Sequence, residues 1–251
     1  MNEAARESTY NDDLPGIGLE VIPLTSGEQD ALDQEGYFVF PSALDAHALD
    51  ALRKAFEEAC SHASQVNKES GTRHINDVVN RDPVFELVYT NPKTLAAVHH
   101  VLRCPFRLSQ IGGRDPLPGF GQQGLHSDWM ARTKGEPFRV VTAISLLDDF
   151  TADNGATRLV PGTHLLLNNP PKNMAAPANR HPEQKIVIAK AGSVLVFNGH
   201  LWHSGTRNDS NLPRRVMQCV FVARNEFRST RLTCDRPDRL SAAARYILAI
   251  G

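Results

Sequence analysis

The chain contains little cysteine for its length. Four cysteines occur in 251 residues, and none of them forms a C-x-x-C pair or a spacing typical of zinc sites. Cys60 lies in a helical pattern and Cys219 in a strand pattern, where a free cysteine behaves as a small apolar residue. We therefore expect reduced thiols, as in a cytoplasmic protein, and neither a disulfide framework nor a cysteine metal site.

Long apolar runs are also missing from the sequence. A membrane-spanning helix needs roughly 18 or more consecutive apolar residues, and no segment approaches that length. The first 13 residues, MNEAARESTYNDD, are polar and acidic, so they lack the apolar core of a secretory signal. These absences predict a cytoplasmic protein without a membrane partner.

Charge of one sign is not in excess, because 27 basic residues are balanced by 28 acidic ones. A nucleic-acid-binding protein usually carries a basic excess or a basic stripe, and a membrane-surface protein often carries a polybasic block. Neither is present, so we expect no nucleic-acid partner. A small molecule is left as the expected substrate, and the sequence leaves the oligomeric state open.

The length and composition are those of an ordinary globular protein, with 41% hydrophobic and 22% charged residues. A chain of this length can bury most of its apolar surface without covalent cross-links. The expected organisation is a flexible tail at residues 1–18 followed by a single domain at residues 19–251.

The first part of the chain has helical periodicity. Leu49, Leu52, Phe56 and Cys60 recur at three- and four-residue steps, which indicates a helix with one buried face. Another helix is expected to begin at a Ser26 N-cap and to end before Gly36. The expected helices span residues 26–34, 45–64, 83–89, 92–102 and, near the end of the chain, 240–250; a short strand spans residues 37–40.

Short β-rich runs alternate with Gly, Pro, Asn and Asp clusters after Pro105. Strands are expected at residues 107–112, 125–129, 139–147, 157–160, 185–189, 193–197, 201–204 and 215–223, with a long loop at 165–181. Eight short strands separated by turn residues favour a sandwich or jelly roll. The predicted fold class is α+β, mainly β, with the N-terminal helices buttressing one sheet of a cupin-like jelly roll.

One motif in the β-rich part has the spacing of a metal site. His126 and Asp128 are two residues apart in a predicted strand, so both side chains should point to the same face. By itself, H-x-D is more often a pair of surface or capping residues. A third ligand is available in His203, and His200 is the alternative. Two histidines and one carboxylate form the facial triad of iron(II) oxygenases, which leaves other coordination positions open.

Arg214 follows His203 near the entry to the last predicted strand. If that strand turns back antiparallel, Arg214 can reach the same cavity as the metal ligands. A guanidinium pairs well with the distal carboxylate of a dicarboxylic acid. We expect this role for Arg214, and a solvated surface charge for Arg215.

These motifs resemble those of the phytanoyl-CoA dioxygenase-like 2-oxoglutarate oxygenases, which include ectoine hydroxylase. The resemblance covers roughly residues 30–225. Its three parts are LHSDW at residues 125–129, DFTADNG at 149–155 leading to VPGTH at 160–164, and HSG at 203–205 followed by Arg214.

The resemblance implies a double-stranded β-helix that binds Fe(II), with 2-oxoglutarate as co-substrate and O₂ as oxidant. By position, His126, Asp128 and His203 match the metal ligands of the family. Arg214 matches the residue that pairs with the C5 carboxylate of 2-oxoglutarate.

Two further residues match co-substrate contacts of some family members. Thr142 corresponds to a hydroxyl that touches the C5 carboxylate, and Gln110 corresponds to an amide that contacts the co-substrate. Either residue could equally be a satisfied polar group of the core. The chain departs from the pattern at Gly205, where some members have a serine, although Ser204 is adjacent.

The expected function is hydroxylation of an unactivated C–H bond in a small metabolite or biosynthetic intermediate, with release of succinate and CO₂. The alternatives are a cupin-like metal-dependent hydrolase or isomerase, and a non-catalytic jelly roll that binds a metabolite. Substrate contacts are expected from the segments 73–81, 112–123 and 165–181, with the candidates Arg73, Asn76, Arg114 and Trp129.

Overall fold

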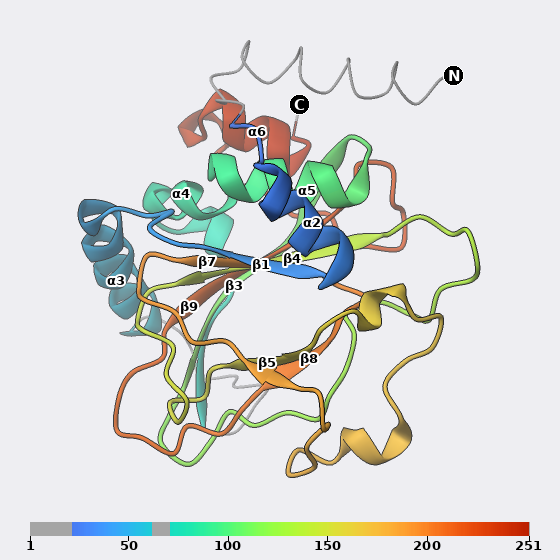
Figure 1. Ribbon diagram of the computed structural model, residues 1–251. Coiled ribbons are helices and arrows are strands. Elements are labelled where there is room, and N and C mark those ends of the chain that lie inside the picture. The colour runs from blue at the N-terminus through green and yellow to red at the C-terminus, as the bar shows by residue number, and fades with distance from the viewer. Residues whose placement is uncertain (1–21, 62–70, 251) are drawn as a thin grey trace.

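The computed structural model describes residues 22–61 and 71–250 (Figure 1). The expected tail at residues 1–18 lies outside the described residues, and so do residues 62–64 at the end of the second expected helix. The described part consists of two antiparallel β-sheets, with helices behind the larger one (Figure 1).

The larger sheet has six strands in the order β1-β7-β4-β9-β3-β2, and the smaller one has three in the order β6-β5-β8. Only antiparallel pairs occur among the described strands, as in a jelly roll. The strands are β1 (Tyr37–Phe40), β2 (Thr72–Ile75), β3 (Phe106–Pro116), β4 (Val140–Leu146), β5 (Thr157–Val160), β6 (Lys185–Ile186), β7 (Val194–Asn198), β8 (Trp202–Gly205) and β9 (Val216–Ala223).

Side chains of the central strands alternate between two hydrophobic cores. On β4, Val141 and Ala143 face the helices, whereas Ile144 faces the smaller sheet. On β9, Cys219 packs into the helix-side core, as expected for a free apolar cysteine, and Val216 packs between the sheets. This period of two is the reason that both faces of the larger sheet are covered.

The helices cover the face of the larger sheet that points away from the smaller one (Figure 1). They are α2 (Ser26–Gln34), α3 (Ala46–Ser61), α4 (Glu86–Tyr89), α5 (Pro92–Leu102) and α6 (Ala242–Leu248). Five short 3₁₀ turns are also described: η1 (Val78–Asn80), η2 (Pro83–Phe85), η3 (Thr163–Leu165), η4 (Lys172–Ala175) and η5 (Pro237–Arg239). In the described part of the chain, no helix is long and apolar enough to cross a membrane.

The start of α2 differs from the expectation. Its N-cap is Thr25, which forms a capping box with Glu28, so Ser26 is the first helical residue and not the cap. The helix ends as predicted at Gly36, which has φ +83° and donates from its backbone N–H to the Ala31 carbonyl.

The segment 125–129 is not a strand, contrary to the sequence-based expectation. It makes one isolated bridge, between His126 and His203, because Asp128 then turns to donate from its backbone N–H to the Gly199 carbonyl. Strand β2 was not expected, and β6 is shorter than the predicted strand at 185–189. The expected helix at 83–89 forms as the 3₁₀ turn η2 followed by α4.

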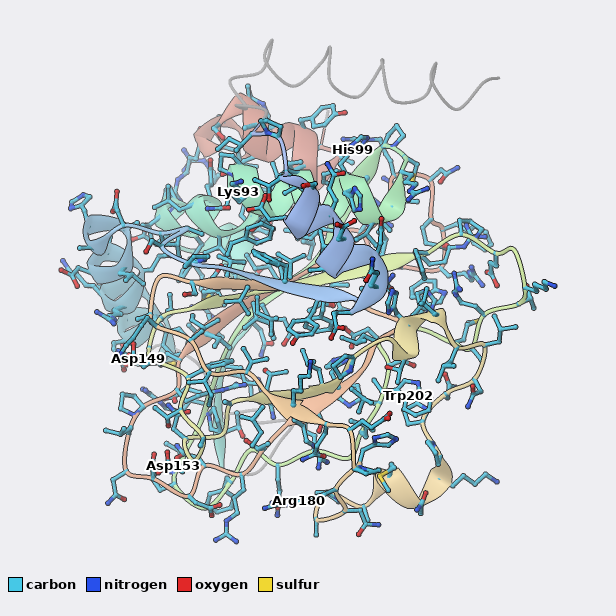
Figure 2. All side chains as sticks on the ribbon, in the orientation of Figure 1. Lys93, His99, Asp149, Asp153, Arg180 and Trp202 are labelled. Atoms are coloured by element: carbon cyan, nitrogen blue, oxygen red, sulfur yellow. The ribbon has the colours of Figure 1, made fainter. Side chains whose placement is uncertain are left out.

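The long loop at residues 165–181 lies beside β5 and β8. The buried Arg158 on β5 donates to the carbonyls of Asn179 (2.7 Å) and Pro177 (3.3 Å). Trp202, at the start of β8 (Figure 2), donates from its indole nitrogen to the Asn168 carbonyl. The loop is therefore attached to the smaller sheet at both of its ends.

Replacing Gly36 with alanine tests the contact between the end of α2 and His164, which lies in η3 just after β5. A Cβ atom at Gly36 would lie 2.4 Å from Nδ1 of the buried His164, and the backbone has a positive φ. We expect Gly36→Ala to lower the free energy of unfolding by about 2–4 kcal/mol, measured by chemical denaturation.

Gly27→Ala is the matched control for this variant. Gly27 lies within α2 and has no atom within 4 Å of its would-be Cβ. This substitution should leave stability unchanged or raise it by up to about 1 kcal/mol. Equal effects of the two substitutions would contradict the close contact between Gly36 and His164.

Candidate active site

Two backbone hydrogen bonds bring the H-x-D motif against β8. The N–H of His126 donates to the His203 carbonyl (3.0 Å), and the N–H of His203 donates to the His126 carbonyl (2.8 Å). The two imidazole rings consequently lie next to each other, with centroids 4.5 Å apart. A strand at residues 125–129 was expected to bring the ligands to one face. The bridge between His126 and His203 has this effect for the two histidines.

Asp128 reaches the same place through a turn. Its backbone N–H donates to the Gly199 carbonyl at 2.7 Å. Gly199 permits this approach because a Cβ there would lie 3.2 Å from the Asp128 Cβ and 2.5 Å from a Val140 methyl group. The Asp128 carboxylate therefore meets the two imidazole rings at the gap between the sheets.

The three side chains form a compact cluster. Asp128 Oδ1 lies 3.4 Å from Nε2 of His203 and 3.9 Å from Nε2 of His126. One ligand atom from each of the three residues falls within 4.8 Å of the others, and this is the one such group among the residues at 22–61 and 71–250. These separations match those of donor atoms that share a single metal ion.

The backbone fixes the tautomer of both histidines. Nδ1 of His126 donates to the Gly124 carbonyl and Nδ1 of His203 to the Leu201 carbonyl, each at 2.9 Å. With the proton on Nδ1, Nε2 carries the lone pair, and both Nε2 atoms face Asp128. This arrangement is the one that orients imidazole ligands toward a metal.

The electrostatics of the cluster favour a cation. Burial alone would raise the pKa of Asp128, but His203, a hydrogen bond from Thr142 and His126 together lower that pKa to about 2. Burial lowers the pKa of His126. Burial also acts to lower the pKa of His203, and the Asp128 charge outweighs it, so that pKa is raised. A positive charge between these groups is therefore stabilised.

The structure places Thr142 differently from the expectation. The Thr142 hydroxyl was expected beside the distal carboxylate of the co-substrate, but it donates to Asp128 Oδ2 at 2.5 Å. The cause is its position on β4, where it faces the gap between the sheets, opposite Asp128. Oδ2 is thereby satisfied, and Oδ1 is the oxygen that faces the histidines.

A cavity of about 310 Å³ extends from the histidines along the inner face of the larger sheet. His126 is the more exposed of the two histidines, with 42% of its side chain accessible, whereas His203 is buried at 7%. Arg214 lines the same cavity, as the sequence predicted, and it is 2% exposed.

Arg214 is held from its backbone to its tip. Its backbone N–H donates to Asp115 Oδ1 (3.1 Å), its guanidinium lies 4.6 Å from the centre of the Phe150 ring, and Nη2 donates to the Thr157 hydroxyl (3.2 Å). Arg215 is not the solvated charge expected from the sequence. Its guanidinium is ion-paired with Asp148 and Glu57.

The other expected residues divide between the cavity and the rest of the molecule. Gln110, Asn76 and Arg114 line the cavity. Arg73 instead forms ion pairs with Glu57 and Asp115. The Trp129 ring lies beneath the Arg228 guanidinium, 5.4 Å from it.

His200, the alternative ligand, does not belong to the metal-ligand cluster. Its Nε2 accepts from the Arg139 backbone N–H, and its ring lies 5.9 Å from that of Phe138. His164 bonds to the Asp33 carbonyl, which is a structural role. His203 is thus the third member of the cluster.

Three residues near the site were not singled out from the sequence. Gly199 allows Asp128 to approach, Thr157 contacts Arg214, and Arg158 fixes the neighbouring loop and donates to Ser204 Oγ at 2.6 Å. The N-G-A-T run at residues 154–157 overlaps the end of the DFTADNG motif at 149–155, so Thr157 could have been found there. The roles of the other two depend on contacts between distant segments.

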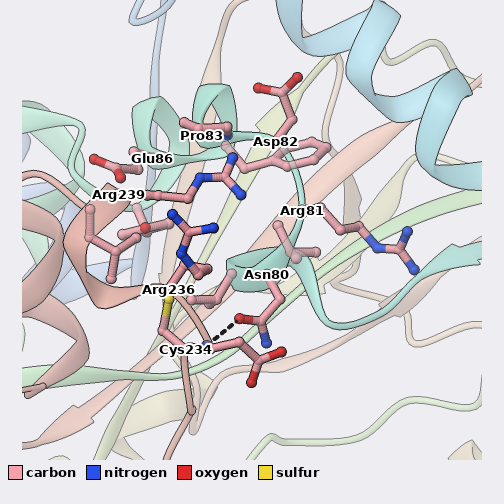
Figure 3. A pocket seen from close by; sticks show the side chains of 14 residues that line it. Asn80, Arg81, Asp82, Pro83, Glu86, Cys234, Arg236 and Arg239 are labelled. Atoms are coloured by element: carbon pink, nitrogen blue, oxygen red, sulfur yellow. Dashed lines mark hydrogen bonds between the residues drawn. The ribbon is translucent and has the colours of Figure 1, made fainter.

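A second cavity, of about 140 Å³, lies between η1, η2, α4 and the segment 234–240 (Figure 3). Arg81, Arg236 and Arg239 border it, but Arg236 is paired with Asp238 and Arg81 donates to the Asn76 carbonyl. None of its lining residues belongs to the metal-ligand cluster, so it is separate from the candidate active site.

The sequence profile of the phytanoyl-CoA dioxygenase (PhyH) family matches residues 32–216. Dioxygenase trt7 of Aspergillus terreus is 28% identical over 228 residues, covering 80% of this chain and 77% of its own. The uncharacterised protein Rv1501 of Mycobacterium tuberculosis is 30% identical over 207 residues, covering 77% of this chain and 74% of its own.

Solved structures share the fold. HygX from Streptomyces hygroscopicus, with nickel, 2-oxoglutarate and hygromycin B bound, superposes with a TM-score of 0.67 at 20% identity, covering 80% of this chain and 88% of its own. The epimerase SnoN, in complex with Fe³⁺, α-ketoglutarate and nogalamycin RO, superposes with a TM-score of 0.66 at 20% identity, covering 78% of this chain and 82% of its own.

A jelly roll with two histidines and a carboxylate at the gap between its sheets defines the class of non-haem iron oxygenases. The chain belongs to the phytanoyl-CoA dioxygenase family. It is a 2-oxoglutarate-dependent non-haem iron dioxygenase, with Fe(II), 2-oxoglutarate and O₂ as its cofactor and co-substrates. The donor set fits Fe(II), because two Nδ1-protonated imidazoles and one carboxylate leave open positions on the metal.

Loss of either histidine of the cluster should abolish tight metal binding. We expect His126→Ala and His203→Ala to weaken Co(II) affinity, measured by anaerobic isothermal titration, by about 100-fold or more. Thr142→Val should weaken it by about 10-fold, because Asp128 loses the hydrogen bond that orients it.

His200→Asn is the matched control, because it removes the buried imidazole that is nearest in sequence. It should bind Co(II) like the unsubstituted protein, and circular dichroism would verify that each variant is folded. Loss of binding in His200→Asn together with retention in His203→Ala would contradict the assignment.

Proposed function

We propose that this enzyme hydroxylates an unactivated C–H bond of a small metabolite or biosynthetic intermediate and releases succinate and CO₂. One observation carries the proposal: a single cavity is lined both by His126 and His203, two members of the cluster with Asp128, and by the buried Arg214. When bound, Fe(II) together with 2-oxoglutarate and O₂ supplies the oxidising power for such a reaction. The residues of the chain supply binding, orientation and exclusion of water.

Arg214 is proposed to bind the distal carboxylate of 2-oxoglutarate. Its guanidinium is buried and lines the cavity, and a carboxylate can accept two parallel N–H donors from it. Asp115 holds the Arg214 backbone, and the contacts with Phe150 and Thr157 hold the guanidinium in place before the co-substrate enters. Gln110 lines the same cavity and is proposed to contact the co-substrate through its amide.

Thr142 is proposed to orient the metal ligand Asp128. Its hydroxyl occupies Oδ2, so that Oδ1 alone faces the two Nε2 atoms. A carboxylate held in this way coordinates through one oxygen, and coordination positions remain for the co-substrate and O₂.

The substrate is proposed to be a small molecule with several hydrogen-bonding groups. Asn76, Gln110, Arg114 and Gln218 give the cavity polar side chains that both donate and accept. The bound molecules of two relatives of the same fold, hygromycin B in HygX and nogalamycin RO in SnoN, support a small-molecule substrate here.

Removing the Arg214 guanidinium should weaken co-substrate binding without weakening metal binding. Truncating one partner of a buried charge pair costs about 2–5 kcal/mol, so the 2-oxoglutarate KM of Arg214→Ala should rise about 30-fold or more. Arg214→Lys should recover only part of this loss, because an ammonium group cannot bridge two oxygens in the same way. Co(II) affinity should be unchanged.

Arg215→Ala serves as the control for the arginine variants, since its side chain is ion-paired with Asp148 and Glu57. Its 2-oxoglutarate KM should stay close to that of the unsubstituted enzyme. The opposite pattern, with Arg215→Ala impaired and Arg214→Ala normal, would transfer the role to Arg215.

The reaction itself is tested with a panel of candidate metabolites supplied with Fe(II), 2-oxoglutarate and O₂. We expect one member to stimulate succinate release and to gain one oxygen atom, which carries the label when the O₂ is isotopically labelled. His203→Ala should give neither signal. Stimulated succinate release with a product that gains no oxygen would rule out hydroxylation in favour of another oxidative outcome.

A further inference from the structure

The second cavity, between η1, η2, α4 and the segment 234–240, has an apolar floor. Val78, Phe85 and Tyr89 line it and are each 1% exposed, and Leu240 lines it at 7%. An apolar group that entered this space would leave water and contact these side chains, which favours binding. The floor therefore suits a small molecule with an apolar body.

Tyr89 places an unpaired hydroxyl in this floor. It makes no hydrogen bond with any described residue, and its oxygen is not fully enclosed, so it opens onto the cavity. Burial, with a smaller contribution from Glu86, raises the pKa of Tyr89, so the phenol stays protonated and offers an O–H. A donor in so buried a place is costly to leave without an acceptor. The acceptor has to come from a molecule that enters the cavity.

Arginine side chains reach over the same cavity from its rim. Figure 3 shows the side chains of Arg236 and Arg239 extending toward the middle of the cavity. Arg236 is paired at 3.1 Å with Asp238, two residues along the chain. The exposed Arg239 makes no hydrogen bond or ion pair through its guanidinium with any described residue. Its planar set of N–H donors is thus available for a carboxylate.

The charges around the cavity favour a ligand with a single negative charge. Three arginines in the lining are balanced by three acidic residues, which are Asp82, Glu86 and Asp235. A dianion such as phosphate would face these carboxylates, and its second charge would be repelled. A carboxylate carries one charge and matches the planar guanidinium.

We propose that the second cavity binds a small monocarboxylate with an apolar body. The carboxylate pairs with Arg239 at the rim, and a hydrogen-bond acceptor at the far end of the molecule meets the Tyr89 O–H at the floor. None of the residues that line this cavity lines the one at the metal-ligand cluster. The site is therefore independent of the proposed function of the active site.

The probe is 4-hydroxybenzoate, which has a carboxylate at one end of an apolar ring and a hydroxyl at the other. It is titrated into ¹⁵N-labelled protein loaded with Zn(II) and saturating 2-oxoglutarate, so that the active site is occupied. We expect saturable shifts of backbone amide signals in residues 78–89 and 234–241. Shifts confined to residues 124–128, or no saturable binding, would refute the site.

Two variants test the two ends of the ligand separately. Arg239→Ala should weaken both 4-hydroxybenzoate and benzoate by about 10-fold, because each loses a hydrogen-bonded charge. Tyr89→Phe should weaken 4-hydroxybenzoate by about 5-fold, the usual effect of losing a neutral hydrogen bond, and should leave benzoate unchanged. The neutral analogue 4-hydroxybenzamide should bind the unsubstituted protein more weakly than 4-hydroxybenzoate does.

Arg231→Ala is the matched control, because Arg231 is an exposed arginine of the same C-terminal segment that does not line the cavity. It should bind both probes normally. Unchanged 4-hydroxybenzoate affinity in Arg239→Ala or in Tyr89→Phe would overturn the proposal. So would an equal loss of benzoate and 4-hydroxybenzoate in Tyr89→Phe, since the effect would then come from a change in the shape of the floor.

Discussion

The backbone bridge between His126 and His203 is the interaction on which the rest of the site depends. It joins the segment after β3 to β8, and so connects the two sheets where they diverge. Once the bridge forms, Asp128 turns against Gly199 and meets Thr142 on the larger sheet. The smaller sheet therefore positions the two histidines through β8, and the larger sheet positions Asp128 through Thr142. The geometry of the cluster depends on the distance between the two sheets.

The two ends of the cavity have different support. At the metal end, carbonyl groups orient the imidazoles, and a single hydroxyl orients the carboxylate. At the Arg214 end, two carboxylates give the support: Asp115 and Asp148 accept from the backbone N–H groups of Arg214 and Arg215. Asp115 is itself paired with Arg73. The corner that precedes β9 is thus fixed by two carboxylates, one on β3 and one in the segment after β4.

Sequence patterns were sufficient where the information is local. The short β-rich runs located β1 and β5 to the residue, and the family motifs selected His126, Asp128 and His203. Features that depend on pairing between distant segments could not be predicted. Examples are the single bridge in place of a strand at 125–129, and the position of Thr157 opposite Gly205. Neither follows from the sequence without the register of the sheets.

The buried Arg158 has a consequence for the way molecules enter and leave. Its hydrogen-bond acceptors in the described structure are neutral oxygens, namely those of Ser204, Asn179, Gln184, Gln123 and Pro177. Moving residues 177–179 outward would strip partners from a buried charge, which is costly. This part of the long loop is accordingly a fixed wall. Exchange between cavity and solvent is therefore expected where other lining residues, Asn76, Gln110 and His126, are open to water.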